Sequence, residues 1–446
     1  MKKFFYLFIF SSIFIIIQSL DLKAYQYNQQ AIFIQAFMIA IISSTLLFLV
    51  VYKLLEFEEL RNSNKAIYIT GWEVFTITLF GLFSIILIYL VSIDGLHDYS
   101  DYIKQWETIN KGLDPWVGTS NSYLPIHNIF APLIKLNNSF PKILFFVLFS
   151  ISLYLTSVTS IGLKNDLSRS SKLVIFTIFY LSPFCLSITL LYGLNDSVVT
   201  GLILLCLYFS ISKNIRFNNI FAGIFLSFAT LIKIYPLFIA PVFIIKKGTF
   251  DKNFLISYLS ANISIILTSY FIWGRSIINP IIFAMNRHSK HLSFFNFSRK
   301  IIGLNLDKYS IFLMVIVFVI SILVIYRFKL DIVPSVIVTL SFVLSFYKVG
   351  HQQFFLFLFA STPITLRYIF SKNIHLNKRL LISFLVWISF LNFYQTFYLF
   401  SFEMSRGLSH YMRGFSSIAY ILSCSFMLIE FIKLLKKSPK VLSSDN

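Results

Sequence analysis

Four of the chain's 18 acidic residues lie in one short segment, HDYSDYIKQWETINKGLDPW at residues 97–116. These acids are Asp98, Asp101, Glu107 and Asp114. Asp98 follows a long apolar run by only a few residues, so its carboxylate is expected at the edge of a membrane, where lipid headgroups lie. A carboxylate in that place is a candidate general base for a substrate hydroxyl. The alternative for each of these acids is a solvated loop residue.

Lys233 lies inside an apolar run, LIKIYPLFIAP at residues 231–241, next to a Tyr-Pro break. A charged side chain in a membrane segment costs at least about 2.5 kcal/mol on insertion scales, so it indicates a function unless the ammonium group reaches an interface. A phosphate group would offset that cost. Lys233 is therefore a candidate ligand of a lipid phosphate.

Two further segments are rich in cations that alternate with Phe and Tyr: residues 275–300 and the turn FYKVGHQQFF at residues 346–355. Both are expected on the outer face of the membrane, where an excess of Lys and Arg is unusual and indicates an anionic ligand. The candidate phosphate ligands in these segments are Arg287, His291, Lys348 and His351.

Two polar positions have alternative interpretations. Asp196, in the turn GLNDSVV at residues 193–199, is either a second carboxylate of the site or a cap for the helix that it opens, since Asn and Asp are preferred caps. His127, in SYLPIHNIFAPL at residues 122–133, is interpreted as an interfacial residue beside aromatic side chains. Ligand binding is the alternative for His127.

The composition of the chain predicts that membrane-spanning helices position these residues. The chain has 446 residues, of which 57% are hydrophobic and only 13% are charged, a composition far from that of a soluble domain. Apolar runs of about 20 residues, long enough to cross a bilayer as helices, recur along the chain. The expected crossings lie near 4–20, 31–52, 74–93, 143–162, 173–193, 197–212, 219–233, 236–246, 253–272, 310–326, 332–347, 354–370, 380–400 and 415–434.

The charge pattern predicts how these helices are threaded through the membrane. The net charge of +20 comes from Lys and Arg residues that fall mostly in short connections, which favours a topological role over a nucleic-acid partner. Successive helices cross the membrane in opposite directions. This alternation places every short basic connection on the cytoplasmic side and the two long connections, 94–142 and 273–309, on the outer side. The short runs 219–233 and 236–246 could instead form one re-entrant unit around KIYP. The three cysteines lie in apolar runs without paired spacing, so neither a disulfide framework nor a metal site is indicated.

Taken in order, these motifs resemble the integral-membrane glycosyltransferases of the GT-C superfamily. Within that superfamily they are most similar to the polyprenyl-phosphate-mannose-dependent mannosyltransferases of family 87 and to the first mannosyltransferases of GPI-anchor synthesis. The motifs that carry the resemblance are DYSDY (98–102), GLDPW (112–116), YLP (123–125), NDS (195–197), KIYP (233–236) and KVGHQQFF (348–355). The GPI enzymes have Asp-x-Asp in the first outer loop, whereas this chain has Leu96-His97-Asp98.

The resemblance implies an all-α, GT-C-type bundle of roughly 12–14 transmembrane helices with long outer loops. Two extra helices and a cytoplasmic loop would occupy residues 1–72, the catalytic module 73–372, and C-terminal helices with a basic tail 373–446. It also implies an inverting transfer of a hexose, with mannose favoured, from a polyprenyl-phosphate sugar to a lipid-linked or glycan acceptor, and Asp98 as the base. We expect no cofactor and no bound metal. The positions expected to contact substrate are Asp101, Tyr102, Tyr123, Asn195, Asp196, Tyr235 and Gln353.

We expect a multi-pass protein of a bacterial inner membrane, with its active site on the periplasmic or extracellular face. A flippase or transporter of lipid-linked sugars is an alternative, although transporters often show paired halves and no internal repeat is visible in this sequence. An O-antigen-type polymerase is a further alternative, since such enzymes are also polytopic with long outer loops.

Overall fold

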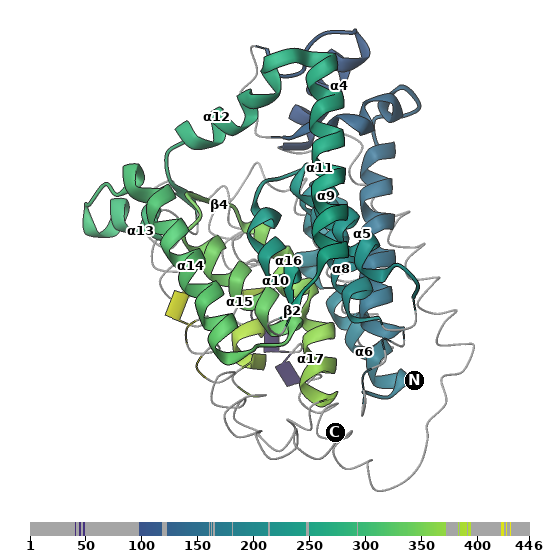
Figure 1. Ribbon diagram of the computed structural model, residues 1–446, viewed down its shortest axis with the longest axis vertical. Helices are drawn as coiled ribbons and strands as arrows, with labels where there is room; N and C mark the ends of the chain where they lie inside the picture. The colour runs from purple at the N-terminus through teal and green to yellow at the C-terminus, as the bar shows by residue number, and fades with distance from the viewer. Residues whose placement is uncertain are drawn as a thin grey trace, which may run out of the picture. The chain divides into compact units, whose positions relative to one another are not determined.

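The computed structural model describes residues 98–117 and 123–371, apart from short gaps near 160–165, 181, 213–214, 247–248 and 292, together with isolated positions within 41–49, 382–393 and 421–429. Over these residues the chain is almost entirely helical (Figure 1). The paired strands described are two residues long: β1 (Ile245–Lys246) is antiparallel to β2 (Thr249–Phe250), and β3 (Lys290–His291) is parallel to β4 (Val349–Gly350). The expected all-α class is confirmed.

The chain divides into two compact units, each assembled from separate stretches of sequence. Unit 2 comprises Ile69–Gly162 and Leu186–His288, and unit 1 comprises Met1–Tyr68, Leu163–Cys185 and Ser289–Asn446. The helices of unit 2 are α4 (Asp98–Asn110), η1 (Pro125–Lys135), α5 (Phe140–Val158), η2 (Ser187–Leu191), α8 (Asp196–Ile211), α9 (Asn218–Thr230), η3 (Tyr235–Ile239), α10 (Ala240–Ile244), α11 (Lys252–Trp273), η4 (Gly274–Ile278) and α12 (Asn279–Asn286).

The core of unit 2 is a row of apolar helices in which α5 packs on α8, α8 on α9 and α9 on α11 (Figure 1). Helix α8 is buried along nearly its whole length, which accounts for its being apolar on all sides. Helix α9 ends at Thr230, and the chain turns through residues 231–234 before η3 begins. The break predicted at KIYP is therefore present, and Lys233 lies in it.

The first long connection is folded. We expected residues 94–142 to form a loop, but α4 and the 3-10 helix η1 occupy much of this segment and pack against each other. Tyr99, Tyr102 and Trp106 are all buried, and their spacing of three and four residues places them on one face of α4. This aromatic stripe explains why a segment rich in acidic residues forms a helix.

Unit 1 contains the second half of the second long connection and the helices that follow it. Residues 273–309, which we also expected to form a loop, include η4 and α12 in unit 2 and short helices in unit 1. The helices of unit 1 are α6 (Arg169–Tyr180), α7 (Pro183–Leu186, at the boundary), α13 (Phe294–Phe297), η5 (Ser298–Ile302), η6 (Asp307–Tyr309), α14 (Ser310–Phe328), α15 (Ile332–Ser345), η7 (Gln352–Phe355), α16 (Leu356–Ala360) and α17 (Thr362–Ser371).

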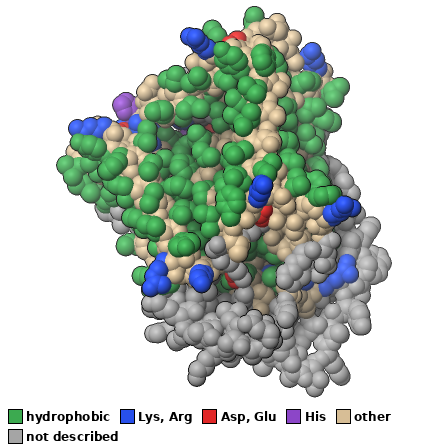
Figure 2. Space-filling model, in the orientation of Figure 1, with side chains coloured by type: hydrophobic (Ala, Val, Ile, Leu, Met, Phe, Trp, Pro, Cys, Tyr) green, Lys and Arg blue, Asp and Glu red, His purple; other side chains and the backbone are tan. Residues whose placement is uncertain are grey.

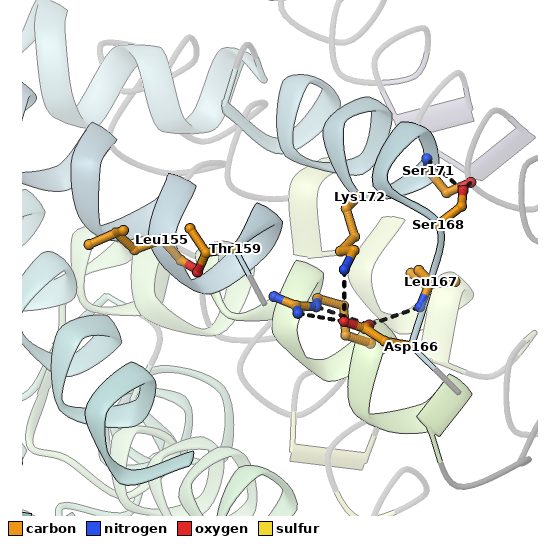
Figure 3. A network of polar contacts seen from close by, with 8 residues as sticks. Leu155, Thr159, Asp166, Leu167, Ser168, Ser171 and Lys172 are labelled. Atoms are coloured by element: carbon orange, nitrogen blue, oxygen red, sulfur yellow. Dashed lines mark hydrogen bonds and ion pairs between the residues drawn. The ribbon is translucent and has the colours of Figure 1, made fainter. Parts of the chain in front are cut away.

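A partly buried ionic cluster joins α6 and α17 in unit 1. Asp166 accepts hydrogen bonds from Arg367 Nη2 at 2.6 Å, from Arg367 Nε at 3.1 Å and from Lys172 Nζ at 2.9 Å (Figure 3). Burial alone would raise the pKa of Asp166, but the hydrogen bonds and charges of Arg367 and Lys172 outweigh it and hold that pKa below its ordinary value. The carboxylate therefore stays ionised and holds the two helices together.

Four described helical runs are long and apolar enough to cross a membrane: Phe140–Val158, Lys252–Asn286, Asp307–Phe328 and Gln353–Ser371. A fifth crossing results if the bent pair Ser171–Tyr180 and Phe184–Leu190 forms one span. Only 11% of the apolar window is buried in each of Lys252–Asn286 and Asp307–Phe328. Hydrophobic side chains dominate the face drawn in Figure 2. These features are those of a multi-pass membrane protein.

Most crossings predicted from apolar runs between residues 143 and 370 correspond to helices within a few residues. The predicted runs 253–272 and 310–326, for example, are matched by α11 and α14. The runs near 4–20, 31–52, 74–93, 380–400 and 415–434 lie wholly or largely outside the described residues. The total of 12–14 crossings and the proposed regions 1–72 and 373–446 therefore stay predictions.

Candidate active site

Asp98 is the first residue of α4, and Asp101 lies in the same turn. Asp98 is half-buried. Asp101 is exposed and forms an ion pair of 3.3 Å with Lys104 of the same helix. The two acids thus lie in different environments although only three residues separate them.

Two buried tyrosines lie next to Asp98. The rings of Tyr102 and Tyr123 meet edge to face at 4.7 Å, and burial followed by nearby charges, including that of Asp98, raises the pKa of both phenols well above the ordinary value. Asp98 also acts electrostatically on Asp196. The structure therefore brings Asp98, Tyr102, Tyr123 and Asp196 into one neighbourhood of unit 2, as the sequence predicted.

Asp196 and Lys233 form a buried ion pair. Lys233 Nζ donates to Asp196 Oδ2 at 2.6 Å, and the side chains are 9% and 0% exposed, respectively. Asp196 is the first residue of α8 and follows Asn195 at the N-cap, where no side-chain capping bond forms. Asp196 is therefore not the N-cap of α8, and its side chain contacts Lys233 instead. Its role as a site carboxylate stays a prediction.

The turn beside Lys233 is joined to the first connection through backbone hydrogen bonds. Leu124 N donates to Ile232 O at 3.2 Å, and Ile126 N donates to Leu231 O at 3.0 Å. These carbonyl groups lie just past the end of α9, where backbone acceptors lack helical partners. The bonds hold the segment that carries Tyr123 and His127 against the turn that carries Lys233.

Asn195 links three elements through its side chain. Its Oδ1 accepts from Tyr102 Oη of α4 at 3.0 Å. Its Nδ2 lies 3.2 Å from His127 Nδ1 of η1. Because an amide nitrogen can only donate, His127 Nδ1 accepts this bond, and the proton of the neutral imidazole lies on Nε2. Asn195 therefore fixes both the position and the tautomer of His127.

His127 is fully buried, and it lies beside aromatic side chains as the sequence indicated. Its ring stacks on Trp106 at 4.9 Å and contacts Tyr102 and Tyr123, each at 4.7 Å. Burial and the nearby charge of Lys233 lower its pKa well below the ordinary value, so the ring is neutral at neutral pH. The local sequence gave little sign of this, because the aromatic partners and Lys233 come from other segments.

Lys142 is a second buried lysine of unit 2 that the sequence analysis missed. It is 4% exposed, and its ammonium nitrogen lies 6.0 Å from the centre of the Tyr99 ring. Its stem packs on Gly193, where an added Cβ would lie 2.7 Å from Lys142 Cγ. Gly193 also has a φ of +61°, so a glycine is required there on both counts.

The cationic segments of unit 1 meet through backbone pairing. In the β3–β4 pair, His291 lies opposite Gly350 and Lys290 opposite Val349, and Lys290 N donates to Lys348 O at 3.3 Å. The pairing therefore brings the backbones of Lys290 and Lys348 next to each other, whereas His291 lies two residues along the ladder from Lys348. Asp307 accepts a hydrogen bond from Ser289 N at 3.0 Å and lies 3.6 Å from Arg299 Nη1, which anchors the segment before β3.

The remaining predicted residues have separate locations. The His351 ring lies 5.5 Å from that of Phe354, and Gln353 is 3% exposed, both in unit 1. Arg287 belongs to unit 2, where its guanidinium lies 5.4 Å from the centre of the Phe283 ring. Tyr235 is 1% exposed and begins η3. Among the described residues no group of three or more His, Cys, Asp or Glu could hold a metal ion.

No protein-family model matches the chain. The chain is similar to GPI mannosyltransferase 1 of Dictyostelium discoideum, with 25% identity over 232 residues that cover 44% of this chain and 51% of that protein. It is also similar to GPI mannosyltransferase 1 of Candida albicans, with 26% identity over 172 residues that cover 37% and 41% of the two chains. The chain thus spans about half the length, or less, of the curated relatives it matches. Its similarity to the GT-C membrane mannosyltransferases is distant and partial.

Proposed function

We propose that this protein is an inverting membrane glycosyltransferase that moves a hexose, with mannose as the first choice, from a polyprenyl-phosphate sugar to a hydroxyl group of a lipid-linked or glycan acceptor. The observation that carries this proposal is the location of Asp98 at the start of α4, close to the buried Asp196–Lys233 pair. The similarity to GPI mannosyltransferase 1 supports both the reaction class and the choice of mannose.

In the proposed reaction, Asp98 removes the proton of the acceptor hydroxyl as that oxygen attacks the anomeric carbon of the donor. The bond between that carbon and the phosphate oxygen breaks, and the polyprenyl phosphate leaves with the bonding electrons. A positioned general base contributes roughly 10²–10⁴ to such a step. Attack from the face opposite the phosphate inverts the configuration of the sugar.

The departing phosphate requires positive charge. The charge of Lys233 is offset by Asp196 at 2.6 Å, so we propose Lys233 only as a secondary phosphate ligand. Arg287, His291, Lys348 and His351 stay the further candidates that the sequence indicates. Preorganised cations stabilise developing negative charge more strongly in a site that excludes water.

We further propose that the site lies on the periplasmic or extracellular face of a bacterial inner membrane. The proposal depends on the charge pattern of the connections, since short basic loops favour the cytoplasmic side. The acceptor is taken to be lipid-linked or a glycan, because a site at headgroup depth is accessible to both.

The proposed function is tested by reconstituting the purified protein in liposomes with radiolabelled polyprenyl-phosphate mannose and a lipid extract as the source of acceptor. We expect a new mannosylated product, identified by mass spectrometry, and no product from a nucleotide-activated mannose. Polyprenyl-phosphate glucose serves as the second donor. If no polyprenyl-phosphate hexose yields a covalent product, the glycosyltransferase proposal is wrong. Movement of intact lipid-linked sugar across the bilayer would then favour the flippase.

A further inference from the structure

Two buried polar atoms in the site have no hydrogen-bond partner among the described residues: His127 Nε2 and Asp196 Oδ1. Both residues are 0% exposed. An unsatisfied buried polar group costs about 1–3 kcal/mol. Such groups are rare in native proteins and require an explanation.

The two residues are neighbours in the folded protein. Asn195, which is hydrogen-bonded to His127, precedes Asp196 in the chain. Lys233, which is paired with Asp196, acts electrostatically on His127. Both His127 and Asp196 therefore lie around the same turn at the start of α8.

Their hydrogen-bonding capacities are complementary to one kind of group. The bond from Asn195 places the imidazole proton on Nε2, so His127 offers a donor there. Asp196 Oδ2 is occupied by Lys233, so Oδ1 offers an acceptor. A hydroxyl group accepts one hydrogen bond and donates one. A hydroxyl group therefore carries both the acceptor that His127 Nε2 lacks and the donor that Asp196 Oδ1 lacks.

The surroundings suit a sugar. His127 lies among the rings of Trp106, Tyr102 and Tyr123. Ligand sites that combine apolar and aromatic walls with a few placed polar groups are typical of small-molecule recognition. Asp98, the proposed base, acts electrostatically on both tyrosines, so this neighbourhood lies close to the proposed reaction centre.

We propose that His127 Nε2 and Asp196 Oδ1 bind one hydroxyl group of the donor hexose, which makes His127 a specificity-determining residue. This inference rests on the proposed function. Because both atoms are enclosed in this structure, the hexose reaches them only after a covering side chain moves. A buried water molecule offers the same chemistry, and the experiment must distinguish it from a sugar hydroxyl.

The experiment combines a protein change with deletion of single hydroxyl groups from the substrate. kcat/KM is measured for polyprenyl-phosphate mannose and its monodeoxy analogues with the parent protein, His127→Ala and His127→Gln. On the full sugar we expect kcat/KM of His127→Ala to be about 10-fold below that of the parent, which corresponds to a hydrogen bond of about 1.4 kcal/mol. On the one analogue that lacks the bound hydroxyl group, His127→Ala and the parent should have the same kcat/KM. His127→Gln retains an N–H near the Nε2 position and should recover part of the loss.

The control variant is Thr339→Val, which removes a similarly buried hydroxyl group without a described partner from α15 of unit 1. It should leave the pattern across the analogues unchanged. If His127→Ala loses the same factor on every analogue, the two atoms hold water or serve packing only, and the subsite proposal is wrong.

A second measurement keeps the subsite testable if the parent protein transfers no hexose. Thermal unfolding of the parent and of His127→Gln and His127→Ala is followed in detergent with free mannose and with monodeoxy mannoses. A stabilisation that requires one hydroxyl group and is lost in His127→Ala supports the subsite even where the transferase proposal fails. If every sugar stabilises the protein equally, or if none stabilises it, the subsite proposal is wrong.

Discussion

Lys233 and Asp196, 37 residues apart in the chain, form a 2.6 Å ion pair that is almost completely enclosed. Removing one member of such a pair leaves an uncompensated buried charge, which typically destabilises a protein by about 3–5 kcal/mol. We therefore expect Lys233→Met alone to lower the free energy of unfolding strongly, and the double variant Lys233→Met/Asp196→Leu to lower it less. SDS titration in mixed micelles measures the difference.

The exposed pair Lys104–Asp101 is the matched control, since its side chains are 74% and 63% exposed. Such surface pairs contribute about 1 kcal/mol or less, so Lys104→Met should have little effect. If the double variant at 196 and 233 is less stable than both single variants, the two side chains do not act as a compensated pair.

Asp98→Asn should lower kcat at least about 100-fold while leaving the unfolding transition unchanged, because a positioned base contributes roughly 10²–10⁴. Glu107→Gln is the control, since Glu107 is an exposed acid of the same helix. Asp101→Asn should cause a smaller loss than Asp98→Asn. Turnover of Asp98→Asn within about threefold of the parent would exclude Asp98 as the base.

Gly193→Ala should destabilise unit 2 by more than the backbone strain alone. A residue with a Cβ at positive φ costs about 1–2 kcal/mol, and the stem of Lys142 occupies the Cβ position at 2.7 Å, which adds about 1–3 kcal/mol for overpacking. Gly112→Ala is the control, because Gly112 has a φ of +74° but no atom within 4 Å of an added Cβ. Equal losses of stability in the two variants would show that the Lys142 side chain moves aside without an energetic cost.

Arg367→Met should lower the free energy of unfolding at neutral pH and change how that free energy depends on pH. The pKa of Asp166 is held below its ordinary value, so its stabilising effect is complete above about pH 4 and is lost as the pH falls through the lower folded-state pKa. Without Arg367, which is 1% exposed, we expect a loss of about 2–4 kcal/mol at pH 7 that shrinks towards pH 3.

Arg327→Met serves as the control for the acid dependence, because Arg327 is exposed at the end of α14. Unfolding by SDS is followed from pH 3 to pH 7 in all three proteins. The same pH profile in the parent and in Arg367→Met would mean that Arg367 does not set the ionisation of Asp166.

Cysteine labelling tests the orientation in the membrane. In a protein whose own cysteines are replaced, we expect Lys111→Cys and Lys290→Cys to react with an impermeant maleimide in intact cells. Arg169→Cys and Lys252→Cys should react only after lysis. All four positions are exposed, so access within the fold does not limit the reaction. Protection of position 111 in intact cells would place the proposed active site on the cytoplasmic side.

Within the described part of the chain, the helices were predicted well where the apolar run was uninterrupted. Helix α14, for instance, spans Ser310–Phe328 where residues 310–326 were predicted. Length and hydropathy alone determine such a segment. Helix α4 was missed because its buried face consists of aromatic residues in a segment whose acids suggested a loop. A test for the spacing of Tyr99, Tyr102 and Trp106 would have found it.

The residues of the candidate site were predicted in part. The contacts that were not predicted join residues that are far apart in the sequence. Asp98, Tyr102, Tyr123 and Asp196 do lie together. For Lys233 a phosphate partner was predicted, whereas in the structure its partner is the carboxylate of Asp196. Which of two distant charges meet depends on how α8 and α9 pack, and no local pattern encodes that. The same holds for His127, whose burial depends on Asn195 and Trp106 from other elements.

Helix α11 has 22 residues, which corresponds to a length of about 33 Å, and large apolar side chains such as Ile263, Leu267 and Phe271 are exposed along it. The length of this helix is close to the hydrocarbon thickness of about 30 Å of an ordinary bilayer, so acyl chains are the expected cover of its apolar surface. A much thinner bilayer would leave part of that surface in water or force the helix to tilt. Since α11 packs on α9, whose end leads into the turn with Lys233, a tilt of α11 would disturb that turn. The acyl-chain length of the lipid used for reconstitution is therefore expected to affect the turn that carries Lys233.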